Sequence, residues 1–279
     1  MIYRDFAKTG LRASVVGMGT YYDPAWIALA MILKVQQGRG TKIQALKAGL
    51  DAGINFIDTA EIYQSETIVA EAISGRKRDE LFIASKVWSN HLQRGSVLKS
   101  CEKSLSRLKT QYVDLYQVHF PSSRVPIKET MGAMEELMDQ GKIRAIGVSN
   151  FSLSQMEEAE AALSKHELSS TQMDYSLIHR DIEKDILPHC QEKKIAVIAY
   201  YPLGHGKLAS GPGANRVADV AKSRNLQPAQ VALSWLFSKS NNVFPIPRAS
   251  RIVHVRANAE AGNVVLTSEE VAALDKAFS

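Results

Sequence analysis

Four residues that can move a proton occur where buried strands are predicted to end or just beyond. Asp58 lies in the run NFIDTA at 55–60, and Tyr63 follows five positions later. Lys86 comes near the end of LFIASKV at 81–87, and His119 ends VDLYQVH at 113–119. A phenol alone is too weak an acid for efficient proton transfer at neutral pH, so any catalytic role of Tyr63 depends on its neighbours.

The neighbours have the types that such a phenol needs. An ammonium near Tyr63 would favour the phenolate and lower the pKa of the phenol. A buried Lys86 would lose its own charge unless a carboxylate faced it, and Asp58 is the natural partner. His119 can donate a hydrogen bond to a substrate oxygen or pass a proton to Tyr63. Taken singly, each residue has an ordinary structural role, but together they predict a site that protonates an oxygen gaining negative charge.

The elements that must position these residues follow from a repeated pattern. Short apolar runs alternate with amphipathic helical stretches, which predicts parallel strand pairing because each helix returns the chain to the start of the next strand. An open doubly wound sheet would carry a phosphate-binding glycine fingerprint after its first strand, and GMGTYYDP lacks the third glycine. We therefore predict an α/β fold, a single-domain (β/α)8 TIM barrel over residues 1–279 with a short N-terminal β-hairpin. The runs lie at 14–20, 55–60, 81–87, 113–119, 143–150, 170–177, 195–203 and 243–249.

Composition limits the other possibilities. The chain has 279 residues, 45% of them hydrophobic, which is enough for a sizeable core. The net charge of +5 indicates either scattered surface lysine or a pocket for an anionic ligand, and no basic run interleaved with aromatic residues predicts nucleic-acid binding. Cys101 and Cys190 form no CxxC motif and no metal-ligand spacing, so we predict no metal site and a reducing, cytoplasmic compartment.

The most unusual segment is the apolar run PAWIALAMILKV at 24–35. It is too short to span a bilayer, which takes about 20 residues. It predicts a core helix, a flap over a pocket or a contact between subunits. We expect no membrane partner, and either a monomer or a weak homo-oligomer.

Motifs over nearly the whole chain resemble those of the aldo-keto reductase family, in the order of the family. They are GMGT, NFIDTAEIY, IASKVW, VDLYQVHFP, GKIRAIGVSNF, TQMDYSL, AYYPLGHGKL and PIPRAS…HVRANAE. The resemblance implies an NAD(P)H-dependent oxidoreductase that reduces aldehydes and ketones by hydride transfer from nicotinamide C4. It implies that Tyr63 is the general acid, tuned by Asp58 and Lys86, and that His119 orients the carbonyl or helps to relay the proton.

The same resemblance implies a nicotinamide dinucleotide, NADPH preferred over NADH, with arginine suited to a 2′-phosphate. Ser149, Asn150 and Gln172 would hold the carboxamide, and Tyr200 would pack against the ring. The remaining predicted cofactor residues lie at strand ends, along the pyrophosphate or around the adenosine: Gly19, Thr20, Asp58, Leu203, Gly204, Gly206, Lys207, Arg248, Ser250, His254 and Asn258. For the substrate, a small carbonyl compound, the predicted contacts are Tyr21, Trp26, Tyr63, Trp88, His119 and Phe120.

Two other functions remain open at this point. Lys86 could form a Schiff base, as in aldolases, although Asp58 argues against the desolvation without a carboxylate partner that this would need. A barrel that binds the nucleotide and turns over little substrate could instead report redox state to a partner.

Overall fold

The computed structural model describes all residues, 1–279, and contains ten strands and twelve α-helices. The strands are β1 (Tyr3–Asp5), β2 (Arg12–Ser14), β3 (Met18–Gly19), β4 (Phe56–Asp58), β5 (Phe82–Val87), β6 (Leu115–Val118), β7 (Ile146–Ser149), β8 (Leu168–Asp174), β9 (Ala196–Tyr200) and β10 (Val243–Pro245). The helices are α1 (Pro24–Leu33), α2 (Arg39–Asp51), α3 (Glu66–Ile73), α4 (Arg94–Leu108), α5 (Ile127–Asp139), α6 (Leu153–Ala162), α7 (Ile186–Lys193), α8 (Pro212–Arg216), α9 (Ala218–Ser223), α10 (Pro228–Lys239), α11 (Ile252–Ala261) and α12 (Ser268–Ala277).

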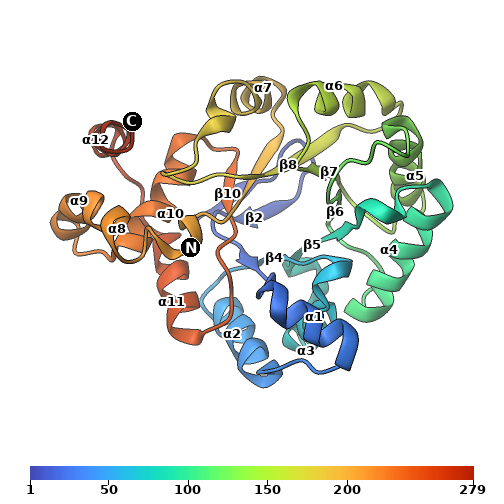
Figure 1. The fold of residues 1–279 in the computed structure, drawn as a ribbon, viewed down its shortest axis with the longest axis horizontal. Coiled ribbons are helices and arrows are strands. Elements are labelled where there is room, and N and C mark those ends of the chain that lie inside the picture. The colour runs from blue at the N-terminus through green and yellow to red at the C-terminus, as the bar shows by residue number, and fades with distance from the viewer.

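Eight of the strands form one parallel sheet in sequence order, from β3 to β10. The sheet curls so that its first and last strands meet, with helices around the outside (Figure 1). Backbone bonds close the ring: Gly17 N–H donates to Pro245 O at 2.9 Å, and Gly19 N–H donates to Pro247 O at 3.0 Å. The predicted barrel is therefore confirmed. The predicted runs overshoot most strands, because their polar last residues lie beyond the ladder.

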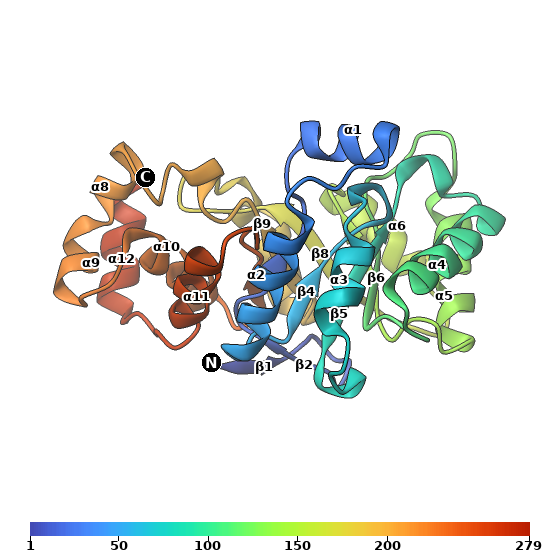
Figure 2. The ribbon, with the colours of Figure 1, turned by 90° about the horizontal axis from the view of Figure 1, so that it is seen from below.

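The predicted hairpin is also present, as β1 and β2 pair antiparallel. It lies at the amino-terminal end of the barrel, on the side opposite α1 (Figure 2). Phe6 follows β1, and the centre of its ring lies 4.5 Å from that of Phe82 and 5.2 Å from that of Phe244. The hairpin thus covers the amino-terminal end of the barrel with the apolar side chain of Phe6. The carboxyl ends of the strands form the opposite, open end.

Helix α1 occupies the apolar segment of the sequence. The carboxylate of Asp23 caps it by accepting a hydrogen bond from Trp26 N–H at 2.7 Å. Trp26 is buried, whereas Ile32 and Leu33 are 76% and 61% exposed. Of the roles left open for this segment, that of a core helix is therefore not the one that the structure shows. No helix is both long enough and apolar enough to cross a bilayer.

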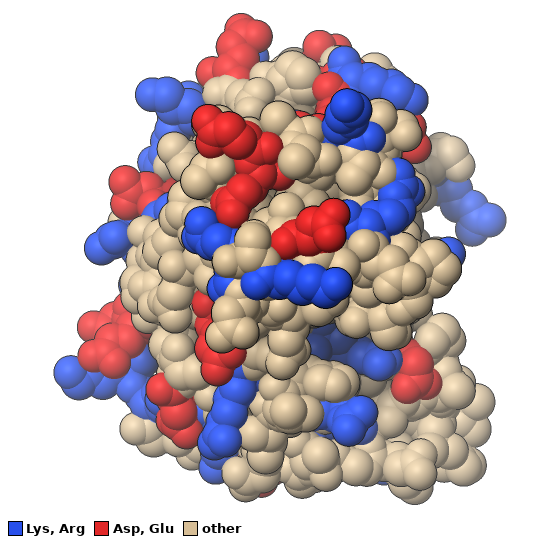
Figure 3. All heavy atoms as spheres, turned by 90° about the vertical axis from the view of Figure 1, so that its left-hand side faces the viewer, with Lys and Arg blue, Asp and Glu red and all other residues tan.

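Charge is mixed on the side of the molecule that carries α8, α9 and α12. Figure 3 shows Lys and Arg interspersed with Asp and Glu there, rather than gathered into one field. Such a face has no single-sign potential to attract a polyanion.

The barrel interior is packed closely enough to require glycine at position 147 in β7. A methyl group there would overlap Ser170 Oγ and lie 2.8 Å from Gln117 Cγ. We expect Gly147→Ala to destabilise the protein by about 1–3 kcal/mol, as overpacking does. Gly132→Ala in α5 is the matched control: nothing lies within 4 Å of the added carbon, and loss of a helical glycine should stabilise by about 0.5–1 kcal/mol. Urea unfolding of both variants checks the pair, and equal stabilities would contradict the packing argument.

Candidate active site

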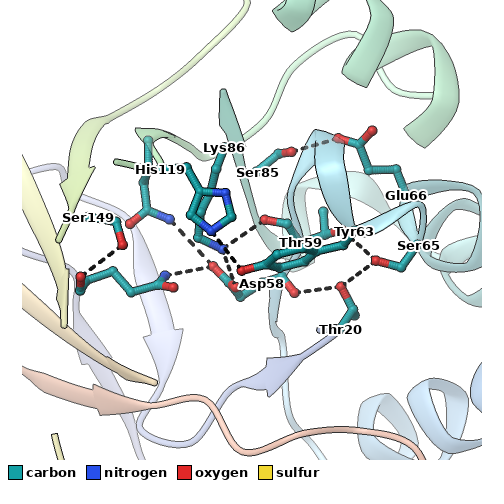
Figure 4. A network of polar contacts seen from close by, with 12 residues as sticks. Thr20, Asp58, Thr59, Tyr63, Ser65, Glu66, Ser85, Lys86, His119 and Ser149 are labelled. Atoms are coloured by element: carbon teal, nitrogen blue, oxygen red, sulfur yellow. Dashed lines mark hydrogen bonds and ion pairs between the residues drawn. The ribbon is translucent and has the colours of Figure 1, made fainter. Parts of the chain in front are cut away.

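The four predicted catalytic side chains converge at the carboxyl ends of neighbouring strands (Figure 4). Asp58 ends β4 and Lys86 lies in β5, while His119 follows β6 by one residue. Tyr63 ends a short 3-10 helix, Glu61–Tyr63, that follows β4. Adjacent parallel strands end at the same edge of the sheet, which is why residues so distant in sequence meet.

A buried ion pair forms the base of the site. Lys86 Nζ lies 2.6 Å from Asp58 Oδ1 and donates a second hydrogen bond to Thr59 O at 3.0 Å. The two side chains are 0% and 2% exposed. A charge so deeply buried is costly without its partner, so each charge offsets the cost of burying the other.

The phenol lies above this pair. Tyr63 Oη and His119 Nε2 are 3.1 Å apart, and Lys86 Nζ lies 4.9 Å from the centre of the Tyr63 ring. The hydroxyl can therefore exchange a hydrogen bond with the imidazole while the ammonium faces the ring. This is the arrangement that a proton donor beside a carbonyl oxygen requires.

The expected lowering of the Tyr63 pKa is wrong for this structure. Burial raises the pKa of Tyr63 well above its usual range, and the negative charge of Asp58 raises it further. The physical reason is that Lys86 is neutralised by the carboxylate it contacts, so its charge does not offset the cost of burying a phenolate. The phenol consequently stays protonated at neutral pH.

Burial also changes the pKa values of the Lys86 ammonium and the His119 imidazole. It lowers the pKa of Lys86, and the adjacent Asp58 offsets this lowering only in part. It lowers the pKa of His119 to about 2, with a smaller contribution from the charge of Lys86. His119 is therefore neutral, with one ring nitrogen a donor and the other an acceptor. Its Nδ1 is buried and has no hydrogen-bond partner.

The second carboxylate oxygen of Asp58 binds two amides. Gln172 Nε2 donates to Asp58 Oδ2 at 2.9 Å, and Gln117 Nε2 lies 3.5 Å from the same oxygen. Gln117 was missed by the sequence interpretation. The available signal was its position two residues before His119, on the same inward face of β6.

Aromatic rings surround the phenol and the imidazole. The centres of the Tyr21 and Tyr63 rings are 5.2 Å apart. The rings of Trp88 and Phe120 each have their centre 5.2 Å from that of the His119 imidazole, with Trp88 edge-on and Phe120 stacked. Phe120 is 40% exposed, as a wall open to an incoming molecule would be. The predicted substrate contacts Tyr21, Trp88 and Phe120 are thus brought to the site.

Trp26 lies elsewhere. Its ring packs edge-on against Tyr22 at 5.0 Å, and its indole N–H donates to Gln37 O at 2.8 Å. It makes no ring contact with Tyr63 or His119, so its predicted role in the substrate pocket is not supported by the geometry.

A model of the aldo/keto reductase family matches residues 34–278. The chain belongs to the aldo/keto reductase family.

Curated relatives and solved structures lie within the same family. The chain is 39% identical over 268 residues to methylglyoxal reductase YeaE of Escherichia coli (strain K12), covering 94% of this chain and 90% of that protein. It is 41% identical over 220 residues to aldo-keto reductase YhdN of Bacillus subtilis (strain 168), covering 75% of this chain and 64% of that protein.

Among solved structures, the thermostable aldo-keto reductase Tm1743 in complex with the inhibitor epalrestat has a TM-score of 0.87 and 35% identity, covering 99% of this chain and all of that one. The aldo-keto reductase of Klebsiella pneumoniae in complex with NADPH has a TM-score of 0.86 and 34% identity, covering 99% and 95%.

In this aldo/keto reductase the predicted carboxamide residues form a linked set. Asn150 Nδ2 donates to His119 O at 2.9 Å and to Ser149 Oγ at 3.0 Å, and Ser149 Oγ donates to Gln172 O at 2.9 Å. Tyr200 Oη donates to Asn150 Oδ1 at 2.7 Å. These bonds fix the side chains beside the imidazole, although the Gln172 amide N–H₂ is directed to Asp58.

Two predicted cofactor residues have a structural explanation of their own. A methyl group on Gly19 would lie 2.8 Å from Ile246 O, so glycine is needed where β3 meets the last strand. Thr20 Oγ1 donates to Asp58 O at 2.9 Å, and the buried Ser65 hydroxyl lies 2.9 Å from it. Thr20 therefore holds the backbone of Asp58 in place.

The residues predicted for the pyrophosphate lie in the loop after β9. Gly204 is tightly packed against Ile178, whereas Gly206 has φ 91° with open space around its α-carbon, and Lys207 is exposed. A backbone that only glycine adopts readily, open on its outer side, suits close approach by a ligand. Leu203 precedes this turn and is half-buried.

The residues predicted for the adenosine lie around the start of α11. The Arg248 guanidinium donates to Tyr22 O, and Ser250 is half-buried. His254 is exposed in the first turn of the helix and Asn258 is buried one turn later. None of these four side chains forms an ion pair with a carboxylate.

Proposed function

We propose that this aldo/keto reductase converts aldehydes and ketones to alcohols, with Tyr63 as the general acid and NADPH as the hydride donor. The single observation that carries the proposal is the hydroxyl of Tyr63 lying 3.1 Å from the neutral imidazole of His119 and beside the buried Lys86–Asp58 pair. When bound, the reduced nicotinamide supplies the hydride.

Each of the four residues has a distinct task in this proposal. Tyr63 gives its proton to the carbonyl oxygen as that oxygen gains negative charge. The raised pKa of Tyr63 suits this direction, since the acid must be protonated beforehand, and an alkoxide is a stronger base than a phenolate. Lys86, held by Asp58, places a positive charge beside the phenolate that forms. His119 is neutral and can donate to the carbonyl oxygen, which orients it.

The chain offers groups that suit the dinucleotide. The open turn at Gly206 and the guanidinium of Arg248, which has no carboxylate partner, would both gain a partner from a bound polar anion. The neighbouring structures from Klebsiella pneumoniae were solved with NADP and acetate and with NADPH. NADPH is therefore proposed in preference to NADH.

The experiment that tests the proposal follows NADPH absorbance with a panel of aldehydes and ketones, repeated with NADH. Methylglyoxal belongs in the panel, because the Escherichia coli relative is named a methylglyoxal reductase. Aromatic aldehydes belong there as well, since Trp88 and Phe120 line the site. Tight NADPH binding without turnover of any of these compounds would overturn the reductase assignment in favour of a nucleotide-binding regulatory role.

A Schiff-base lyase is disfavoured by the geometry. Lys86 is fully buried and lies 2.6 Å from Asp58, so its nitrogen is neither free nor accessible to a substrate carbonyl. Borohydride should therefore trap no substrate adduct on Lys86.

The neutral His119 predicts an unusual pH profile. Because its pKa is lowered to about 2 by burial, the imidazole does not change charge between pH 5 and 8. We expect kcat/KM for carbonyl reduction to show no inflection from His119 in that range. The profile is measured with saturating NADPH for the wild type and for His119→Gln. An inflection near pH 6.5 that disappears in the variant would contradict the prediction.

A further inference from the structure

The backbone directly after Tyr63 adopts a conformation that is unfavourable for any residue other than glycine. Gln64, which follows the 3-10 helix of Tyr63, is left-handed, with φ 58° and ψ 16°. Such a conformation costs free energy and persists only where the surroundings hold it. The next residue, Ser65, is fully buried, so a single constrained residue joins the catalytic turn to α3. Whatever holds Gln64 in place therefore influences the position of the phenol.

A side chain from the segment between α1 and α2 holds Gln64. Gln36 donates from its amide Nε2 to Gln64 O at 2.6 Å, across 28 residues of sequence. The same nitrogen lies 3.3 Å from the hydroxyl oxygen of Thr67 in α3. Gln36 is partly buried, which limits the competition from water for this hydrogen bond. The segment after α1 is thus bonded directly to the carbonyl next to Tyr63.

Arg39, the first residue of α2, orients the Gln36 amide. Its guanidinium donates to Gln36 Oε1, which leaves the NH₂ group directed at Gln64. The same guanidinium donates to Thr67 Oγ1 at 3.1 Å and to Thr67 O at 3.2 Å, and it lies 2.8 Å from a carboxylate oxygen of Glu71. Arg39 is therefore fixed by three groups of α3, and it fixes the direction of the Gln36 amide in turn.

The other end of the 3-10 helix has an anchor of its own. Glu61, its first residue, accepts a hydrogen bond from Trp88 N–H at 2.5 Å, and His91 Nδ1 lies 3.0 Å from the same carboxylate oxygen. Tyr63 thus lies between two anchor points, one at Glu61 and one at Gln64. Because the turn is short, loss of either anchor would let the phenol move.

We propose that Gln36, oriented by Arg39, is a positioning residue for Tyr63. The inference rests on the proposed function, in which the phenol gives its proton to the substrate oxygen. With Gln36 in place, the turn keeps one position and the Tyr63 hydroxyl stays 3.1 Å from His119 Nε2. Without it the hydroxyl can shift, and a misplacement of about 1 Å can lower a rate by about 10²-fold.

The test compares Gln36→Glu with Gln37→Glu. The first variant keeps an oxygen for Arg39 but has no N–H to donate to Gln64, since a carboxylate only accepts. The second introduces the same charge at the next residue, whose side chain is exposed and whose backbone oxygen alone is bonded. At saturating NADPH and substrate, we expect kcat to fall about 10- to 100-fold in Gln36→Glu and to stay at the wild-type value in Gln37→Glu. The affinity for NADPH should be unchanged in both.

Arg39→Met tests the orienting contact. On its own it should also lower kcat, because the Gln36 amide is then free to turn away from Gln64. In Gln36→Met, which has no amide to orient, Arg39→Met should lower kcat no further. Additive losses would mean that Arg39 acts on the site by another route, which would overturn its role as the residue that orients Gln36.

Two measurements separate positioning from a general loss of stability. The solvent deuterium isotope effect on kcat should rise in Gln36→Glu, because a displaced phenol makes proton transfer more rate-limiting. A variant that is only less stable contains less folded enzyme and keeps the wild-type isotope effect, so a lower kcat with that value would contradict the positioning role. Backbone hydrogen exchange over residues 61–66 should be faster in Gln36→Glu than in Gln37→Glu.

The outcomes distinguish this inference from the proposed function. Wild-type exchange over residues 61–66 in Gln36→Glu would show that Gln36 does not hold the turn, whether or not the enzyme turns over. Faster exchange with an unchanged kcat would show that the turn is held without positioning Tyr63, and either result overturns the inference. A wild type that binds NADPH but reduces no carbonyl would overturn the proposed function, and hydrogen exchange would still decide whether Gln36 holds the turn.

Discussion

Tyr63→Phe is expected to lower kcat for carbonyl reduction by about 10²–10⁴-fold, the effect of a lost general acid. The variant removes only the hydroxyl that lies 3.1 Å from His119 Nε2. The ring contacts with Tyr21 and His119 are kept, so the pocket should retain its shape. Steady-state rates at saturating NADPH and carbonyl substrate check the result, and NADPH affinity should be unchanged.

The chain offers a matched control for this substitution. Tyr116 in β6 is also fully buried, and its hydroxyl has no hydrogen-bond partner. Tyr116→Phe therefore removes an equivalent atom that takes no part in the proposed chemistry, and kcat should stay at the wild-type value. If Tyr63→Phe also retained wild-type turnover, Tyr63 would not be the proton donor, whatever its position.

The barrel and the meeting of the four candidate catalytic side chains could be predicted from the sequence because both follow from strand order. Alternation fixes parallel pairing, and parallel strands end at one edge, so Asp58, Lys86 and His119 had to converge. The direction of the Tyr63 pKa could not be predicted in the same way. That direction depends on whether the charge of Lys86 outweighs the cost of burying a phenolate. Because Lys86 lies 2.6 Å from the carboxylate of Asp58, its charge is offset and burial decides the direction.

The prediction of the cofactor residues was limited because the sequence does not indicate where each side chain points. A glutamine in β8 was predicted from the resemblance, but its amide donates to Asp58, and Gln117 approaches the same oxygen. Likewise, the apolar run at 24–35 left a core helix, a flap and a subunit contact open, and it did not indicate where its tryptophan points. Trp26 is positioned by Tyr22, Gln37 and Lys42, and these tertiary contacts leave no local periodic signal.

Lys86→Met should cause the largest loss of stability, about 3–5 kcal/mol, since it leaves a buried carboxylate without its cation. Asp58 is 2% exposed, and amide groups of Gln172 and Gln117 would be its remaining side-chain partners. These dipoles offset a full charge only in part. Urea unfolding of the wild type and the variant measures the difference in the free energy of unfolding.

The double variant Asp58→Asn/Lys86→Met separates stability from chemistry. With both charges gone, no uncompensated ion remains in the barrel, and the double variant should be more stable than Lys86→Met alone. Turnover should not return, because the positive charge beside the phenolate of Tyr63 is still missing. Recovery of stability without recovery of turnover would show that the ion pair both stabilises the fold and supplies the charge needed for turnover. Equal stabilities of the two variants would mean that other groups compensate the buried Asp58, and that the 2.6 Å contact with Lys86 is not what offsets its burial.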